Sequence, residues 1–416
     1  MQEIKNKIKN LNADVVSSMS TTTKEDTMSA VEVYHRVRKI AGTFFSKDVS
    51  ESTRERVAML ITGMIAAKSA SPARIAKALV NLRLSGAQAA SIERRIRRLE
   101  NDTEVTASIC FHSFARFHLL LGRPQELLLV LDPTTQEDKY VMVSVAVWFR
   151  GRALPLAWTL WPANTPLEGD RFWQRIDQLM NELEKLLPSG VSVTLLADRA
   201  FGCPAFIDLV TKRHWHYVVR VQGQTVCRDR MGREQPVESL VPYRNQRAKL
   251  RGQAFKKAGW REVSVVAYWG KRHKKPLCLV SDLKPDWRLI RLYRQRYAIE
   301  GTFRDYKAYG WRWEQGQVRL QAHVERLLVA MALATWLVVL AGNHAAQQIL
   351  NKPPSGKRRT CPWEGKMSVF HLGLELLQSC LVGVGVLPCY LQLSDWNAPS
   401  WKQQLYFHVA RAYVFA

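Results

Sequence analysis

Residues 127–132, Leu-Leu-Leu-Val-Leu-Asp, form an apolar run that stops at a carboxylate. The same pattern returns at residues 191–198, Val-Ser-Val-Thr-Leu-Leu-Ala-Asp, where Asp198 takes the place of Asp132. Short apolar runs rich in Leu and Val, bounded by polar residues, are typical of buried strands. We therefore expect two core strands, each followed directly by an aspartate.

The segments around these two runs alternate between strand and helix patterns. Strand candidates cover residues 140–149 and 153–161, and residues 172–187 have apolar side chains at helical spacing. After the 191–197 strand come a short helix over 204–213 and a strand over 216–221. Three strands, a helix, a strand, a helix and a strand is the order of an RNase H-like α/β domain. We predict that fold class for residues 121–345, with a basic, β-rich insertion over 202–288.

The two aspartates are expected at the same edge of the sheet, where α/β domains place their chemistry. Two carboxylates held close together raise each other's pKa unless a cation lies between them. Asp132 and Asp198 therefore indicate either an acid/base pair or a metal site. The alternative is that each only caps the turn or helix that follows its strand.

A third carboxylate lies in a predicted helix that starts near Leu289. Glu300 follows Tyr293 and Arg296 at a spacing that brings all three onto one helical face, with Lys307 two turns further on. Mg²⁺ prefers oxygen ligands, so a third carboxylate would complete a two-metal site. The alternative is an ordinary surface helix with ion pairs.

The residues Tyr293-x2-Arg296-x3-Glu300-x6-Lys307 resemble the Y-(2)-R-(3)-E-(6)-K signature of the DDE transposases of bacterial insertion sequences, in the insertion-sequence-four superfamily. Residues 198–201, Asp-Arg-Ala-Phe, resemble that family's motif at its second aspartate, and residues 129–132 resemble the motif at the first. The resemblance covers about residues 120–345.

This resemblance implies cut-and-paste DNA transposition with Asp132, Asp198 and Glu300 as catalytic residues that hold two Mg²⁺ ions, for which Mn²⁺ would substitute. It implies that Tyr293, Arg296 and Lys307 contact DNA phosphates and a flipped base, with Arg199 as a further phosphate contact. The implied partners are double-stranded DNA, as transposon ends and as target, and a second copy of the chain in a synaptic complex.

Some members of that family cut the second strand through a DNA hairpin, with an aromatic residue of the insertion placed against a flipped base. The strand nearest to the signature helix, residues 276–280, has no Trp, whereas Trp260, Trp269 and Trp287 lie around it. Each of the three is a candidate for that contact, and each is equally accounted for by packing or by DNA stacking. The hairpin step therefore stays open.

The charge of the chain points to a polyanionic partner. Lys and Arg number 61 against 36 Asp and Glu, a formal charge of +25, while 47% hydrophobic residues indicate a globular protein. Residues 121–201 carry 8 basic and 10 acidic side chains, whereas residues 202–288 carry 19 and 7. The excess therefore surrounds the stretch that contains both aspartates, as expected for a cation site framed by phosphate-binding surfaces.

The flanking regions are predicted to be helical. We expect residues 1–120 to form a helical DNA-binding domain whose last helix presents Arg94, Arg95, Arg97 and Arg98, although a solvated helix face accounts for that run equally well. Residues 346–416 are expected to be a helical region for dimerisation or DNA contact. The apolar run at 327–342 is shorter than the ~20 residues that cross a bilayer, so we expect a buried helix and no membrane partner.

Two other functions fit the same motifs. One is a transposase-derived DNA-binding regulator without catalysis, and the other is a structure-specific nuclease on the RNase H-like fold. The seven cysteines are scattered and never in C-x-x-C spacing, and no secretory signal is visible at the start of the sequence. We therefore expect a cytoplasmic, nucleoid-associated bacterial protein.

Overall fold

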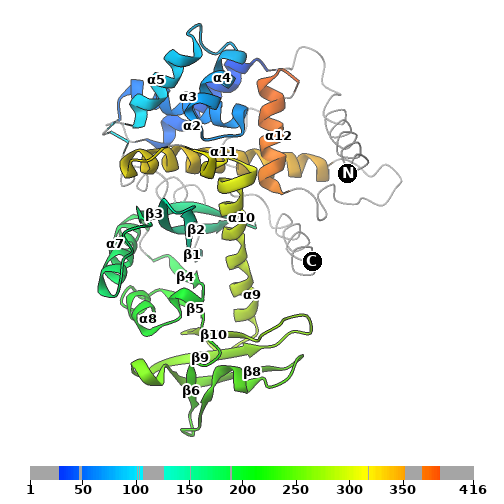
Figure 1. Cartoon of the computed structure of the whole chain (residues 1–416). Coiled ribbons are helices and arrows are strands. Elements are labelled where there is room, and N and C mark those ends of the chain that lie inside the picture. The colour runs from blue at the N-terminus through cyan, green and yellow to red at the C-terminus, as the bar shows by residue number, and fades with distance from the viewer. Residues whose placement is uncertain are drawn as a thin grey trace. The chain divides into compact units, whose positions relative to one another are not determined.

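The computed structural model describes residues 28–45, 49–100, 102, 104–105, 126–149, 151–187, 190–316, 318–351 and 368–384. The chain divides into two compact units (Figure 1). One unit is formed by residues 118–303, and the other by residues 1–117 together with 304–416. All the strands of the described segments belong to the 118–303 unit.

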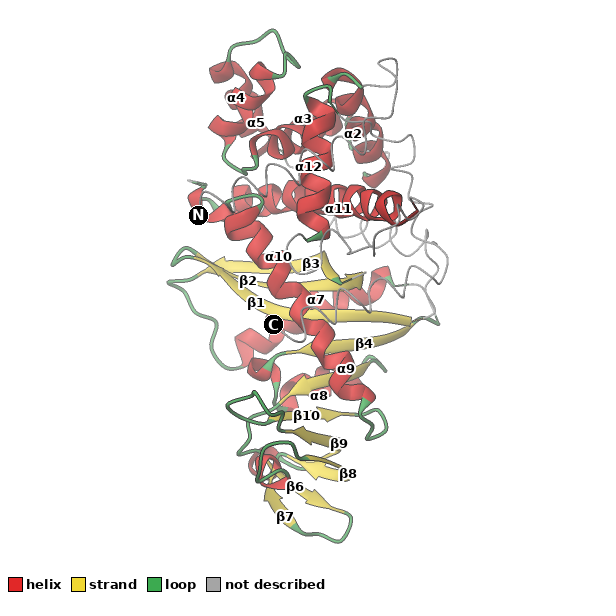
Figure 2. Cartoon of the chain, turned by 90° about the vertical axis from the view of Figure 1, so that its right-hand side faces the viewer, coloured by secondary structure: helices red, strands yellow, loops and turns green. Residues whose placement is uncertain are grey.

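A single ten-stranded sheet forms the centre of the 118–303 unit, in the order β3-β2-β1-β4-β5-β10-β9-β8-β6-β7 (Figure 2). The pairs β1–β4 and β4–β5 are parallel, and the other neighbouring pairs are antiparallel. This large mixed sheet, covered by helices, confirms the predicted α/β class. The strands are β1 (Glu126–Gln136), β2 (Tyr140–Phe149), β3 (Arg152–Pro162), β4 (Ser192–Ala197), β5 (His216–Arg220), β6 (Val226–Asp229), β7 (Glu234–Pro236), β8 (Arg247–Ala254), β9 (Arg261–Tyr268) and β10 (Leu277–Ser281).

Strand β1 is longer than predicted. Its parallel pairing with β4 ends where Leu131 lies opposite Ala197, but its antiparallel pairing with β2 continues to Gln136. The sequence signal stopped at Asp132 because the residues beyond it are polar or proline, while the hairpin with β2 keeps them extended. Asp132 therefore lies inside a strand, at the point where one of its two neighbours ends.

Helices cover both faces of this sheet (Figure 1). The parallel strands are connected through α7 (Asp170–Leu186), before β4, and α8 (Pro204–Thr211), between β4 and β5, as parallel pairs require. The buried residues of α7 are Ile176, Leu179, Met180 and Leu183, one apolar stripe at helical spacing. Helices α9 (Arg288–Arg294) and α10 (Ala298–Arg304) lie on the other face, joined by a 3₁₀ turn, Gln295–Tyr297.

The insertion predicted over residues 202–288 is part of the central sheet. Strands β6 to β10 fall within it, and β10 pairs with β5 so that they extend the sheet laterally. Two short 3₁₀ turns connect these strands: Val237–Leu240 lies between β7 and β8, and Lys256–Ala258 lies between β8 and β9. Residues 202–288, which also include α8 and β5, are rich in strands and bring their basic residues onto the same sheet as the aspartates. A separate insertion over this range stays a prediction.

The other unit is built from helices. Its elements are α2 (Ala30–Phe44), α3 (Glu51–Ala67), α4 (Pro72–Asn81), α5 (Ala89–Glu100), a π-helical turn (Asp305–Tyr309), a 3₁₀ turn (Trp313–Gln315), α11 (Gln321–Asn351) and α12 (Val369–Leu381). Helix α3 contacts α11 and α12, so the N-terminal helices share one core with the later part of the chain. The predicted boundary at residue 120, and a separate DNA-binding domain before it, stay predictions.

Helices α11 and α12 cross at two glycines. An added Cβ at Gly342 would meet the Val369 carbonyl oxygen, and one at Gly373 would meet the Val338 carbonyl oxygen. Only residues without a side chain allow this approach. By length and composition residues 321–343 would be able to cross a membrane, yet 89% of the apolar window is buried inside the protein, as predicted for this helix.

Candidate active site

The two aspartates lie side by side on neighbouring strands. Leu131 pairs with Ala197 in the parallel β1–β4 ladder, so Asp132 and Asp198 are the next residues on neighbouring strands. Asp132 is only 7% exposed and lies opposite Ser144 of β2, whereas Asp198 is half-buried and precedes the 3₁₀ turn Arg199–Phe201. The sheet register therefore produces the juxtaposition that the two sequence runs predicted.

A single arginine connects two of the three predicted carboxylates. Nη1 of Arg296 donates to Oδ2 of Asp132 at 2.9 Å, and Nη2 donates to Oε1 of Glu300 at 2.6 Å. The Arg296 side chain is 6% exposed, that of Asp132 10%, and that of Glu300 47%. One guanidinium thus bridges a buried carboxylate of the sheet and a solvent-facing carboxylate of α10.

Two tyrosines border this guanidinium. The Cζ atom of Arg296 lies 5.7 Å from the ring centroid of Tyr293 and 4.9 Å from that of Tyr297. The hydroxyl of Tyr293, a fully buried residue, donates to Oδ1 of Asp198 at 3.3 Å. Helix α9 therefore reaches Asp198 through Tyr293, and the 3₁₀ turn that follows it reaches Asp132 through Arg296.

The pKa of Asp132 is raised to about 7. Burial is the largest cause, because it removes water from the charged form. The positive charge of Arg296 opposes this rise, and the negative charges of Asp198 and Glu300 add to it. One arginine does not offset three neighbouring carboxylates, so the site has an excess of negative charge that a further cation would balance.

Within the described residues, no group of three or more His, Cys, Asp or Glu side chains is arranged to hold a metal ion. The chemistry of the candidate ligands nevertheless suits Mg²⁺, since all three are carboxylates. The obstacle is Arg296, which engages Asp132 and Glu300 at hydrogen-bond distance. The residues present therefore fit divalent cations if this guanidinium releases at least one carboxylate.

The remaining predicted contact residues, Arg199 and Lys307, belong to different units. Arg199 is exposed on the 3₁₀ turn after Asp198. Lys307 belongs to the other unit, where it lies in the π-helical turn. Its Nζ is 3.4 Å from Oε1 of Glu314, which lies in the 3₁₀ turn that follows. The 3₁₀ turn at 295–297 and the π turn at 305–309 break the regular helix on which one common face had been predicted.

The predicted arginine run lies on α5 of the helical unit. All four side chains are exposed: Arg94, Arg95, Arg97 and Arg98. Arg97 is engaged in an ion pair with Glu93 at 2.8 Å, one helical turn away. The face is basic and open to solvent, and its contact with DNA stays a prediction.

The three tryptophans of the insertion each have an internal partner. Trp260 lies under Arg228, with 4.4 Å between Cζ and the ring centroid, and the indole nitrogen of Trp269 donates to the His273 carbonyl. Trp287 contacts two cations of β8, Arg247 and Lys249. Each of the three indole rings thus contacts another residue of the same 202–288 segment.

Two features of this unit were missed from the sequence. Arg296 was expected to face DNA, and its burial against Asp132 follows from packing of α9 and α10 on the sheet. The second is a pair between His216 and Asp282, with 2.5 Å between Nδ1 and Oδ2, at the start of β5 and the end of β10. The sequence signals this pair only through two polar residues, one at the start of β5 and one directly after β10.

Comparison with known proteins finds a likeness that covers parts of both units. Residues 173–337 match the family model described as the transposase DDE domain. This stretch of the chain is thus similar to a transposase DDE domain. The matched stretch includes Asp198, Glu300 and the residues around them, while Asp132 precedes it.

Among solved structures, one similar chain comes from the cryo-EM structure of a piggyBac transposase synaptic complex with hairpin DNA. Its sequence identity with this chain is 11%, the TM-score is 0.44, and the match covers 92% of this chain and 85% of that one. No curated protein matches the sequence.

Proposed function

We propose that this chain is a DNA transposase that binds the terminal inverted repeats of its own insertion sequence, cuts the DNA there and transfers the strands to target DNA. The observation that carries the proposal is the cluster of Asp132, Asp198 and Glu300 within a chain that is similar to a transposase DDE domain over residues 173–337. The strand order β3-β2-β1-β4-β5, with α7 and α8 as crossovers, supports an RNase H-like core.

Each residue of the cluster has a role in this proposal. Asp132 and Asp198 would hold divalent cations, Mg²⁺ or Mn²⁺, from neighbouring strands, and Glu300 would complete the ligand set from α10. Bound ions would supply Lewis-acid stabilisation of the attacking and leaving oxygens in phosphodiester cleavage and transesterification. Arg296 would release one of its two carboxylates, Asp132 or Glu300, and keep the other in position, and Tyr293 would fix the carboxylate of Asp198 through its hydroxyl.

The finer assignments are also proposals. The Y-R-E-K spacing supports membership in the insertion-sequence-four superfamily. The exposed Arg199 and the arginine face of α5 support contact with DNA phosphates, and Lys307 with its neighbours in the helical unit would add to that contact. Action on two transposon ends requires a homodimer in a synaptic complex, and the chain would work in the bacterial cytoplasm at the nucleoid.

The test is a cleavage assay with purified protein, Mg²⁺ and duplex DNA that carries the ends of the element. Asp132→Asn, Asp198→Asn and Glu300→Gln should each lose cleavage and keep binding to the ends. Asp170→Asn is the matched control, because it removes a carboxylate from the exposed first turn of α7. Retained cleavage in any of the three site variants would contradict the assignment.

The products separate the three candidate functions. Cleavage followed by joining to target DNA supports the transposase. Cleavage of branched DNA without joining, and without preference for the element ends, would indicate the nuclease. Binding to the ends without cleavage by the unmodified chain would indicate the regulator.

A further inference from the structure

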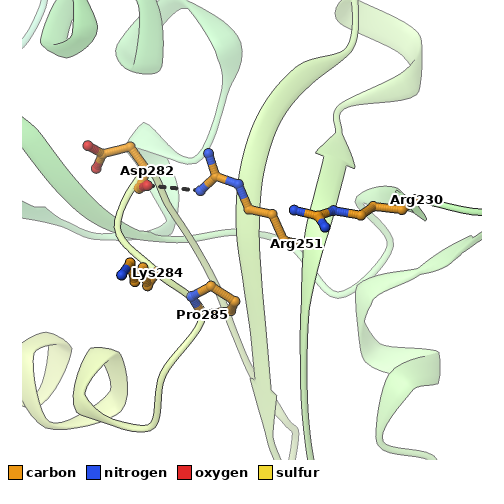
Figure 3. Close-up of a pocket in the computed structure, with 5 residues that line it drawn as sticks. All are labelled: Arg230, Arg251, Asp282, Lys284 and Pro285. Carbon is orange, nitrogen blue, oxygen red and sulfur yellow. Dashed lines mark hydrogen bonds between the residues drawn. The ribbon is translucent and has the colours of Figure 1, made fainter.

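A second site lies in the insertion, outside the carboxylate cluster. A cavity of about 550 Å³ is lined by Arg230, Arg251, Asp282, Lys284 and Pro285 (Figure 3). Arg230 comes from the turn between β6 and β7, Arg251 from β8, and the other three from the loop between β10 and α9. Figure 3 shows Arg230 extending from its turn toward Arg251, with Lys284 and Pro285 on the loop beside them.

Strand directions separate this cavity from the carboxylates. Strand β10 runs antiparallel to β5, and Ser281 at its end pairs with Val218 near the start of β5. Asp282 therefore lies beside the start of β5, whose direction is that of β4. Asp198 follows the opposite end of β4, so the cavity and the carboxylate cluster lie toward opposite strand ends of the sheet.

The cavity has a surplus of positive charge. Within the described part of the chain, Arg230, Arg251 and Lys284 form no ion pair. Arg251 donates to neutral oxygens, at 3.1 Å to the Ser264 hydroxyl and at 2.9 Å to the Asp282 carbonyl. Three cations thus line one open cavity without a carboxylate bound to any of them.

The one carboxylate in the lining is already engaged. Oδ1 of Asp282 accepts from the Tyr217 amide at 2.9 Å, and Oδ2 contacts Nδ1 of His216. Figure 3 shows the Asp282 carboxylate directed away from Arg251, whose hydrogen bond goes to the main chain. The carboxylate of Asp282 is therefore bound to residues of β5. The three cations of the cavity remain available to an external anion.

The basic lining continues along β8 toward α9. Arg247, Lys249 and Arg251 alternate along this strand and so lie on one face of the sheet. Arg247 and Lys249 lie 4.8 Å and 5.2 Å from the Trp287 ring centroid, which orders both cations beside the loop that carries Lys284. One small anion would contact only part of this row of cations. A polyanion, whose charges repeat along its length, would contact all of it.

We propose that the cavity formed by Arg230, Arg251 and Lys284 binds a backbone phosphate of DNA, with Arg247 and Lys249 along the neighbouring phosphates. Guanidinium groups present paired N–H donors to phosphate oxygens, and ammonium groups add a point charge. The choice of DNA as the polyanion rests on the proposed transposase function. The binding of phosphate itself rests only on the charges and hydrogen bonds of the cavity.

A helical path leads from the cavity toward the carboxylate cluster. Lys284 precedes α9, and Glu300 lies in α10 on the same path. A DNA strand bound in the cavity would therefore lie beside the start of this path, away from the position that reaches Glu300.

The first test measures the salt dependence of DNA binding by the full chain, without divalent cation. We use fluorescence anisotropy with a labelled duplex and compare Arg230→Gln/Lys284→Gln with the charge-matched control Arg171→Gln/Lys257→Gln, whose residues are exposed outside the cavity. The cavity variant should lower the slope of log K against log salt by about 0.9, one phosphate contact, and the control should not. Equal slopes for the two variants would overturn the proposal.

The second test distinguishes the source and the position of the phosphate. Inorganic phosphate should weaken duplex binding by the unmodified chain more than chloride at equal ionic strength, and this extra effect should vanish in the cavity variant. On a duplex with the element ends, ethylation of single phosphates should identify a position outside the cleavage point whose effect the variant loses. Equal competition by phosphate and chloride, or an unchanged ethylation pattern, would contradict the site.

These outcomes are independent of catalysis. Failure of the cleavage assay with a normal difference in salt slope would remove the transposase proposal and leave the phosphate site. Normal cleavage with no difference in salt slope would remove the phosphate site and leave the transposase proposal.

Discussion

Nη1 of Arg296 lies 2.9 Å from Oδ2 of Asp132 in the interior of the α/β unit, where both side chains are at most one-tenth exposed. A buried ion pair of this kind contributes little net stability, because the desolvation of both charges offsets their attraction. The ion pair instead fixes the positions of two side chains. The guanidinium of Arg296 holds the carboxylates of Asp132 and Glu300 in one arrangement.

Removal of this guanidinium should destabilise the protein strongly. Arg296→Gln leaves the buried Asp132 without its charged partner, so we expect a loss of about 3–5 kcal/mol in the free energy of unfolding. Glu300→Gln removes the other partner of Arg296, but that side chain is half-exposed, and the loss should stay below about 1 kcal/mol. Urea denaturation of both variants checks this order, and equal losses would contradict the role assigned to the buried pair.

Stability should depend on pH through Asp132. Its pKa is raised to about 7 in the folded chain, while the unfolded value is near 3.8, so the folded state binds the extra proton between these limits. The free energy of unfolding should therefore fall as pH rises from about 4 to 7, by about 4 kcal/mol. Below about pH 4 this stabilisation is fully present, and above about pH 7 it is lost.

Urea denaturation across this pH range checks the prediction. The Asp132→Asn variant should lack this part of the pH dependence, and Asp170→Asn should keep it. Millimolar Mg²⁺ should also flatten the curve of the unmodified chain, because a bound cation favours the ionised carboxylate. An identical pH dependence in the unmodified chain and in Asp132→Asn would show that this carboxyl titrates normally.

The sequence was sufficient to place Asp132 and Asp198 together. Both follow apolar runs, and parallel neighbouring strands bring equivalent positions to one edge. The end of β1 was wrong by several residues, because pairing with β2 continues through a polar segment that has no hydrophobic signal. Hydrophobic patterning thus located the core of the strand and not its hairpin extension.

The helix that carries the signature shows a different limit. A regular helix predicts one face for Tyr293, Arg296, Glu300 and Lys307, but the 3₁₀ and π turns change the rotation per residue. Contacts of Arg296 with Asp132 depend on how this helix packs on a strand more than 150 residues away. No local pattern records such a contact, and the cavity around Arg251 was missed for the same reason.

The crossing of α11 and α12 should not tolerate a side chain. Gly373→Ala would place a methyl group against the Val338 carbonyl oxygen and the Gly342 amide, both of which are main-chain atoms. Forcing the helices apart should cost about 1–3 kcal/mol and lower the thermal midpoint. Gly42→Ala in α2, where nothing lies within 4 Å, should instead keep or raise the midpoint. A midpoint unchanged by Gly373→Ala would show that the two helices can separate without cost.

The hydroxyl of Tyr293 should matter for Asp198 and little for folding. Tyr293→Phe keeps the buried ring beside Arg296 and removes one hydrogen bond of 3.3 Å, so the loss of unfolding free energy should be about 1 kcal/mol. The freed carboxylate of Asp198 should bind divalent cation more weakly, because its orientation is no longer fixed. Titration of Mn²⁺ by calorimetry measures this effect without any cleavage. Tyr297→Phe is the control, since that exposed ring also lies over Arg296, and equal Mn²⁺ affinity in both variants would contradict a positioning role for Tyr293.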